Sequence, residues 1–225
     1  SMNMGPISML NMEKLYKGSI IATSISFEDG KILTASKAYA GKEITDIWRK
    51  YGGNKIDKDL LERLPSKNIA TEFALNFKPE GLMELLKLAG IDGFVNLFLN
   101  QLGITADDFI KSIKGDIFFA VTDIKTDSTG KTKPQIIFAA NINDQASLDK
   151  LINLAKKQSD NIMPETGGVY FEQNKTLFAV GNDQQFVKDY VSGTKKQPIE
   201  IHKKLNSSAV AGYVDIQYIL QQMMG

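Results

Sequence analysis

The sequence predicts an α+β fold in which one large, mostly antiparallel sheet is backed by helices. A unit made of one strand and one amphipathic helix occurs four times, at residues 69–90, 135–157, 175–193 and 208–225. A strand with one apolar face followed by a helix with one apolar stripe forms half of a layered core. Tight polar turns between strands, of which Asp29-Gly30 is the clearest, indicate the hairpins of an antiparallel sheet.

The unit at residues 69–90 shows this pattern most clearly. Phe73, Leu75 and Phe77 alternate with smaller or polar residues, which places three large apolar side chains on one face of a strand. Pro79 suits the first turn of the following helix, because it has no N–H to lose there. We expect the face that carries Leu75 to be the core face, so that Leu75→Ala lowers the free energy of unfolding by about 2–5 kcal/mol.

The remaining elements follow from the same two periodicities. Before the first unit, the pattern predicts a short helix at residues 7–17, a hairpin at 19–39 that extends the sheet, and helices at 44–51 and 57–64. After it come helices at residues 91–102 and 106–113, paired strands at 116–124 and 135–142, and a second hairpin that turns at Asn174-Lys175. Between residues 135 and 214 the order of elements is β-α-β-β-α-β, which is the order of ferredoxin-like folds.

The chain is expected to form a single α+β domain over residues 19–225, preceded at residues 1–18 by a poorly ordered or short helical lead-in. The polar segment at residues 125–134 is an alternative point of subdivision. A domain of this size buries roughly 70–75% of its unfolded surface, so it needs no metal or disulfide for stability. The Ser1-Met2 start is typical of an expression remnant, and we expect the chain to be part of a longer protein.

Composition argues against several classes of function. The 225 residues carry a formal net charge of +1, which gives no electrostatic argument for binding nucleic acid or an anionic membrane. Arginine, the residue best suited to recognising phosphates and base edges, occurs only as Arg49 and Arg63. Cysteine is absent, which excludes thiol nucleophiles, thiolate metal sites and disulfides. The sequence also lacks the run of about 18 apolar residues that a membrane-spanning helix needs.

Residues for catalysis or metal binding do not form a recognisable set, and neither a cofactor nor a metal is expected. His202 is the only imidazole, and the lysines that follow it predict an exposed position. Asp116 and Asp123 are seven residues apart, which places them on opposite faces of a regular strand. A pair of carboxylates elsewhere in the chain remains the enzymatic alternative, as a hydrolase or isomerase.

Two pairs of aromatic residues are candidates for a binding surface. Trp48 and Tyr51 are one helical turn apart, and both residue types are common interface anchors. Phe94 and Phe98 lie on the helix at residues 91–102, which is apolar on more than one face and is expected to be buried or to meet a partner. Ordinary core packing is the alternative explanation for both pairs.

Three sequence segments are similar to those of a known protein family: IATEFALNF with the following GLMELLKLAG, FIKSIKGDIFFAVTDI, and AVAGYVDIQYIL. Together they resemble the uncharacterised Bacteroidetes lipoproteins of a domain family of unknown function, over residues 19–225. The resemblance implies an extracytoplasmic protein of the cell envelope that is held by a lipid anchor. The cysteine to which such an anchor is attached is absent from this chain.

These observations lead to a hypothesis about function. The chain is expected to be a non-enzymatic extracytoplasmic binding or structural module that recognises a protein or glycan, without a role in nucleic-acid binding. Its contact with a membrane is expected only through a lipid anchor that this chain lacks. We further expect some of its apolar surface to meet a missing domain or a second copy.

Overall fold

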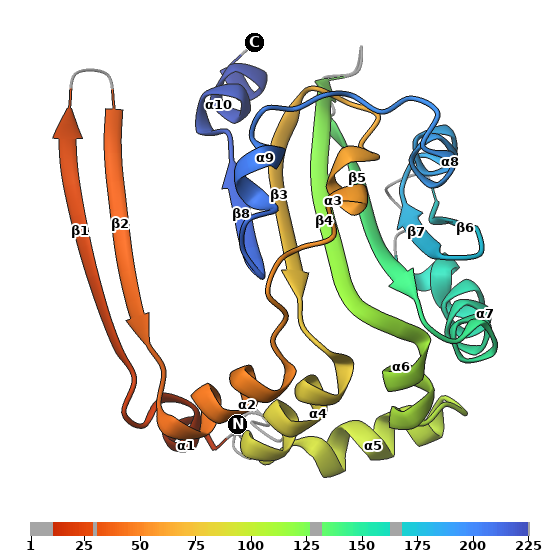
Figure 1. Ribbon diagram of the computed structural model, residues 1–225. Coiled ribbons are helices and arrows are strands. Elements are labelled where there is room, and N and C mark those ends of the chain that lie inside the picture. The colour runs from red at the N-terminus through yellow and green to blue at the C-terminus, as the bar shows by residue number, and fades with distance from the viewer. Residues whose placement is uncertain (1–10, 29–30, 127–131, 163–167, 225) are drawn as a thin grey trace, which may run out of the picture.

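A computed structural model describes residues 11–28, 31–126, 132–162 and 168–224. It contains a six-stranded sheet packed against helices, and a separate two-stranded hairpin to one side (Figure 1). The strands are β1 (Ile20–Glu28), β2 (Lys31–Tyr39), β3 (Ile69–Asn76), β4 (Ile113–Thr126), β5 (Thr132–Ile142), β6 (Tyr170–Gln173), β7 (Leu177–Gly181) and β8 (Val210–Val214). The helices are α1 (Met12–Tyr16), α2 (Lys42–Tyr51), α3 (Lys58–Glu62), α4 (Pro79–Leu88), α5 (Asp92–Gln101), α6 (Ala106–Ser112), α7 (Gln145–Ile162), α8 (Gln184–Ser192), α9 (His202–Leu205) and α10 (Ile216–Met224).

The six-stranded sheet has the order β6-β7-β5-β4-β3-β8, and every neighbouring pair is antiparallel. This confirms the predicted α+β class with an antiparallel sheet backed by helices. The predicted β-α-β-β-α-β order along the chain is also present, as β5-α7-β6-β7-α8-β8, with the short helix α9 inserted between α8 and β8. In space, however, β3 and β4 lie between β5 and β8, and β5 pairs with β7 in the antiparallel direction. The parallel strand pairs of a split β-α-β unit are therefore not formed.

One face of the sheet carries the main hydrophobic core, and we call it the covered face. Helices α3, α8 and α9 lie over it (Figure 1). The Phe118 ring on β4 stacks on the Tyr190 ring of α8 at a centroid distance of 6.1 Å. The Tyr190 hydroxyl donates a hydrogen bond of 2.6 Å to the Leu60 carbonyl, which joins α8 to α3 across this core. Burial of these side chains is the main source of stability for the fold.

The opposite face is covered over only part of its width. Helix α7 places Leu148 and Ile152 against Phe178 of β7, which forms a smaller buried cluster. Over β3, β4 and β8 the same face carries exposed apolar side chains, and we call this region the open face. It consists of Phe73, Phe119, Val210 and Val214, which are exposed, together with the half-buried Leu75, Ile117 and Val121.

The prediction that the Leu75 face of β3 faces the core is wrong. Glu72 and Ala74 point into the covered face, whereas Phe73 is exposed and Leu75 only half-buried on the open face. The reason is the path of the chain after β3. Helix α4 packs beneath the end of the sheet, beside α2 and α6, and so does not fold back over the strand that precedes it (Figure 1).

The hairpin of β1 and β2 confirms the predicted pairing of residues 19–39, although its turn at residues 29–30 lies outside the described residues. It does not extend the six-stranded sheet as predicted, because it forms a two-stranded sheet of its own. At the root of the hairpin, the segment before β1 closely contacts the segment after β2. The Gly41 N–H donates a hydrogen bond of 3.1 Å to the Ser19 hydroxyl, and a Cβ atom at Gly41 would lie 2.0 Å from the Lys17 carbonyl oxygen.

The lead-in is helical where the structure describes it, at α1, and residues 1–10 of the predicted lead-in lie outside the described residues. The alternative subdivision near residues 125–134 falls in the connection between β4 and β5, which are neighbours in one sheet. Residues 127–131 of that connection lie outside the description. The assignment of a single domain stays a prediction.

The two faces of the sheet predict opposite responses at adjacent positions of β4. Phe118→Ala should lower the free energy of unfolding by about 3–5 kcal/mol, because it removes a fully buried ring and leaves a cavity. Phe119→Ala should cost less than half as much, because that ring is 36% exposed on the open face. Urea unfolding of the two variants measures the difference, and equal losses would show that the covered and open faces have been confused.

Candidate functional site

The predicted pair Trp48 and Tyr51 packs α2 onto α4. The Trp48 ring stacks on the Phe77 ring at a centroid distance of 5.2 Å, and the Tyr51 carbonyl accepts a hydrogen bond of 2.9 Å from the Lys78 N–H. Gly81 has no side chain, so α4 can approach the Tyr51 Cβ closely. These contacts agree with the alternative explanation, in which the two residues pack helices together, although Trp48 remains 39% exposed.

Phe94 and Phe98 lie on α5 and are both about half exposed, with exposed fractions of 49% and 52%. Leu97, between them in the sequence, is also exposed. The expectation that this helix is buried is therefore wrong, because α5 has no buried residue. Contact with a partner, the other expectation, stays a prediction. The structure keeps this pair and the Trp48–Tyr51 pair on different helices rather than in one site.

His202 is buried, which contradicts its predicted exposure. Its Nε2 atom lies 2.9 Å from a carboxylate oxygen of Glu72, and both side chains are almost completely shielded from solvent. Glu72 projects from β3 into the covered face, and His202 begins α9, which lies across that strand. Lys203, the next residue, is exposed, but the first residue of this short helix points to the sheet. The pair therefore anchors α9 and has no access to a substrate.

Asp57 and Asp116 line one pocket of about 390 Å³. The Asp57 N–H donates a hydrogen bond of 3.1 Å to an Asp116 carboxylate oxygen. Both Asp57 oxygens also accept hydrogen bonds, one from the Asp59 N–H at 2.9 Å and one from the Asn141 side chain at 2.8 Å. Asp57 thus caps the start of α3, and its carboxylate is held in place by α3 and β5.

Burial raises the pKa of the Asp116 carboxyl group above its usual value. The hydrogen bond from the Asp57 N–H partly offsets this effect, whereas the negative charge of Asp57 adds to the rise in pKa. Two carboxyl groups in one pocket, one of them biased toward its neutral form, are the elements of acid–base catalysis. Sequence reasoning missed Asp57 as the partner of Asp116, since the two residues are 59 positions apart. Asp123 was predicted to lie apart from Asp116, and it does not line this pocket. Its carboxylate accepts a hydrogen bond of 2.9 Å from the Asn68 side chain.

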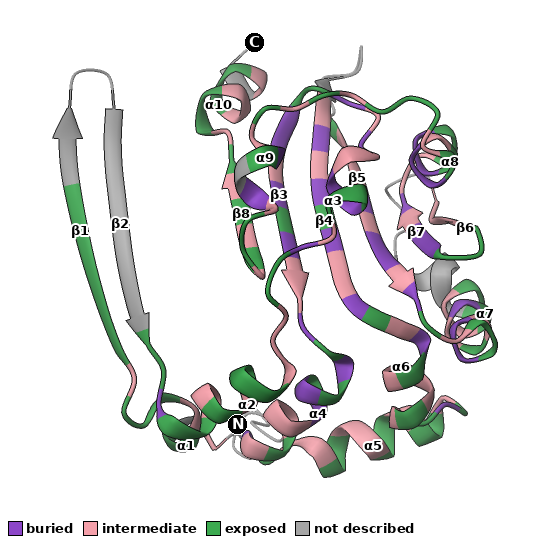
Figure 2. Ribbon diagram, viewed as in Figure 1, coloured by how far each residue is buried: buried purple, intermediate pink, exposed green. Residues whose placement is uncertain are grey.

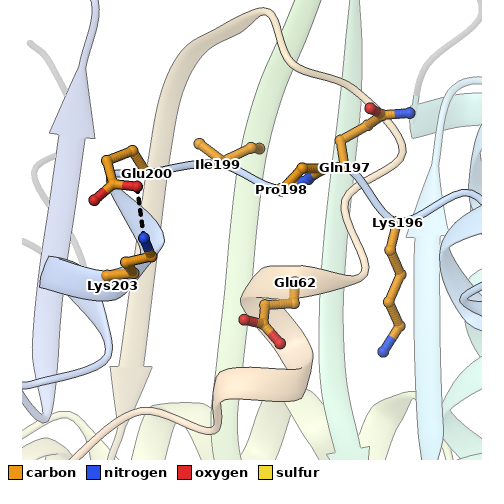
Figure 3. Close-up of a pocket in the computed structure, with 7 residues that line it drawn as sticks. All are labelled: Glu62, Lys196, Gln197, Pro198, Ile199, Glu200 and Lys203. Carbon is orange, nitrogen blue, oxygen red and sulfur yellow. Dashed lines mark hydrogen bonds and ion pairs between the residues drawn. The ribbon is translucent and has the colours of Figure 1, made fainter.

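An open pocket of about 400 Å³ lies between α3, α9 and the segment that leads from α8 to α9 (Figure 3). Its charged side chains already have partners. The Lys203 ammonium group contacts the Glu200 carboxylate at 2.7 Å, and Lys196 contacts Asp59 at 2.8 Å. Glu62 is paired with a lysine of its own helix. Because these charges neutralise one another, the pocket presents no group prepared for catalysis.

The open face is the most distinctive surface of the molecule. Phe73 on β3 lies directly opposite Phe119 on β4, and Val210 and Val214 continue the apolar surface onto β8. Phe73 is 42% and Val214 is 56% exposed. A contiguous apolar patch on a rigid sheet is typical of a protein interaction surface. The alternation along residues 73–77 predicted this face of β3 as core, so sequence reasoning did not identify this surface.

The part of the chain that the structure describes contains no cluster of three or more histidine, cysteine or acidic side chains able to hold a metal ion. None of its described helices is long and apolar enough to cross a bilayer. Comparison with protein-family models, with curated proteins and with solved structures finds no match for this chain. The site must therefore be interpreted from its own geometry.

The contact between His202 and Glu72 predicts a large effect on stability. His202→Ala should lower the free energy of unfolding by about 3–5 kcal/mol, because it leaves the Glu72 carboxyl group buried without its partner. Lys203→Ala, at an exposed position of the same helix, is the matched control and should have little effect. Chemical denaturation of both variants measures this. A His202 variant as stable as the control would show that the pair does not anchor α9.

The raised pKa of Asp116 predicts a pH dependence of stability. Its carboxyl group stabilises the fold below the unfolded-state pKa of about 3.9, and this contribution is lost as the pH rises through the higher folded-state pKa. Asp116→Asn keeps an oxygen that can accept from the Asp57 N–H but carries no charge. We expect this variant to be at least as stable as the wild type at pH 7, with a flatter stability profile between pH 4 and 7. Thermal unfolding across that pH range measures it, and a clear loss of stability at pH 7 would contradict the assignment.

Proposed function

We propose that the chain is a non-enzymatic binding or structural module and that the open face is its surface for another protein. The observation that supports this proposal is the exposed row of large apolar side chains on β3, β4 and β8. Water contact with such a surface is unfavourable by roughly 25 cal/mol per Å² of apolar area, so covering it favours association. The backbone beneath it is fixed by pairing on both sides of β3, so docking costs little conformational entropy.

A protein partner fits the open face better than a glycan does. The exposed side chains are those of phenylalanine and valine, and they offer no hydroxyl, amide or charged group to the hydroxyl groups of a sugar. Aromatic residues at the centre of a patch are typical anchors of protein interfaces. The resemblance to Bacteroidetes lipoproteins supports a further part of the proposal, in which the module works outside the cytoplasm on a lipid-anchored protein of the cell envelope.

A carboxylate-dependent hydrolase or isomerase is the second candidate function. The observation in its favour is the pocket that contains Asp57 and Asp116, where the pKa of one carboxyl group is raised. Asp116 would act as the acid and Asp57 as the carboxylate that assists it. The hydrogen bonds that already hold both Asp57 oxygens argue for a structural role, which is why this function ranks second.

Binding measurements with open-face variants test the leading proposal. Phe73→Ser and Val214→Ser should each reduce binding on peptide arrays, and in pull-downs from envelope extracts, at least tenfold. Each replaces an apolar contact by a hydroxyl group that must be desolvated. Leu97→Ser on α5 is the matched control, because it removes an equally exposed apolar side chain outside the open face. Binding that all three variants retain, or lose equally, would refute the assignment of this face.

A substrate screen separates the two candidate functions. Purified wild-type protein is assayed with ester, phosphoester, glycoside and epimerisable substrates, beside Asp116→Asn. The binding module is expected to show no turnover above the rate of the variant. Turnover that Asp116→Asn abolishes, with the fold intact by circular dichroism, would replace the leading proposal by the enzymatic one.

A further inference from the structure

The hairpin of β1 and β2, which we call the arm, forms a sheet of its own and pairs with no strand of the six-stranded sheet among the described residues. Each of its strands has nine residues, and each pairs only with the other. Ile20, Ile21, Ile25 and Tyr39 are all largely exposed, Ile21 at 73%. Figure 2 shows the described part of β1 exposed nearly from end to end. An isolated two-stranded hairpin is marginally stable in water, so the arm is expected to be completed by another surface.

From its root beside α1 and α2, the arm runs alongside the six-stranded sheet on the β8 side without pairing with it (Figure 1). The contact of Gly41 with Ser19 and Lys17 closes the base of the hairpin, and α2 begins directly after it. On the other side, the Asn11 N–H donates a hydrogen bond of 2.8 Å to the Ala89 carbonyl, which ties the segment before α1 to the end of α4. Both ends of the arm are therefore held at its root, from which it extends over about 30 Å, the length of nine residues in a strand.

The sheet ends on the β8 side at an edge that is open to pairing. The Asn76 N–H donates to the Ala209 carbonyl, and the Asp215 N–H donates to the Ala70 carbonyl. Residues 209, 211, 213 and 215 therefore direct their backbone groups toward β3. The backbone groups of Val210, Gly212 and Val214 must point the other way, to the outer edge.

This edge lacks the features that usually prevent strands from pairing with another chain. The β8 sequence VAGYV contains no lysine, no proline and no charged side chain, and its pairing with β3 shows no bulge. The opposite edge of the sheet, β6, contains Glu172, whose carboxylate lies near Lys188 at 4.0 Å. Of the two edges of the six-stranded sheet, the β8 edge is therefore the one formed by an uncharged, apolar strand.

We propose that the arm of one copy of this chain adds as a strand to the β8 edge of a second copy, and that the exchange is reciprocal. Among the described residues, a single chain carries both a hairpin outside the main sheet and a β8 edge that pairs with β3 alone, and a self-complementary two-fold interface requires such a donor and acceptor together. Each copy contributes one donor strand of nine residues and the five residues of β8, and neighbouring residues complete the 20–30 residues per side of a typical stable interface. The net charge of +1 opposes such self-association only weakly.

The paired arm continues the sheet within its own plane, so the open face stays uncovered and becomes wider. The exchange uses backbone groups at the sheet edge, whereas the proposed partner site uses side chains on the sheet face. The two proposals are therefore independent. A dimer would form whether or not the open face binds another protein.

Substitutions at Val214 test the exchange through the backbone. Val214→Pro removes an N–H that points to the outer edge and places a ring there, while the bonds to β3 are kept. Val214→Ala shortens the same side chain but retains the N–H, so it is the matched control. Sedimentation velocity across concentration should show a dimer for the wild type and the Ala variant, and a dimer at least tenfold weaker for the Pro variant. A monomeric wild type, or a dimer equally strong in all three proteins, would overturn the proposal.

Energy transfer between labelled chains gives a second test that does not depend on the stability of the Pro variant. The natural absence of cysteine allows single labels at Ile25→Cys on the arm and at Ser208→Cys beside β8. Mixing donor-labelled arm chains with acceptor-labelled β8 chains should produce transfer that unlabelled protein competes away. No transfer on mixing, or transfer only within single chains that carry both labels, would overturn the assignment of a second copy.

Discussion

The fold depends on one row of residues that crosses the covered face. In register from β8 to β7 the row is Ala211, Ala74, Phe118, Ala139 and Ala179. Four small side chains leave room for helices to approach the sheet, and the single large ring fills the centre and stacks on Tyr190. Larger side chains in this row would push α3 and α8 away from the sheet, since interiors are packed to crystal density.

Local sequence patterns predict the class of this fold, because strand–helix alternation and turn residues are encoded within a few positions. The same patterns do not tell which face of β3 is covered. Large residues at Phe73 and Leu75 indicate the core by composition, yet the covered face of this strand carries Ala74 and Glu72. The outcome is decided by the path of α4 beneath the sheet and by α3 and α9, which come from other parts of the chain.

The candidate sites escape sequence reasoning for the same reason. His202 lies next to lysines in the sequence but meets Glu72 from 130 positions away, and Asp57 meets Asp116 across 59 positions. Such contacts have no local signature, because they arise only when distant segments pack. The aromatic pairs show the converse: Trp48 and Tyr51 have the spacing of an interface anchor, and the structure uses them to pack α2 against α4.

The close contact at Gly41 controls the direction of the arm. A Cβ atom at this position would lie 2.0 Å from the Lys17 carbonyl oxygen, so any side chain must separate the two segments at the root of the arm. Over an arm of about 30 Å, a rotation of only about 10° at the root displaces the tip by about 5 Å. That displacement exceeds the spacing of adjacent strands. The missing side chain of Gly41 therefore controls the position of the far end of the arm. It also controls the register in which the hairpin can pair with another surface.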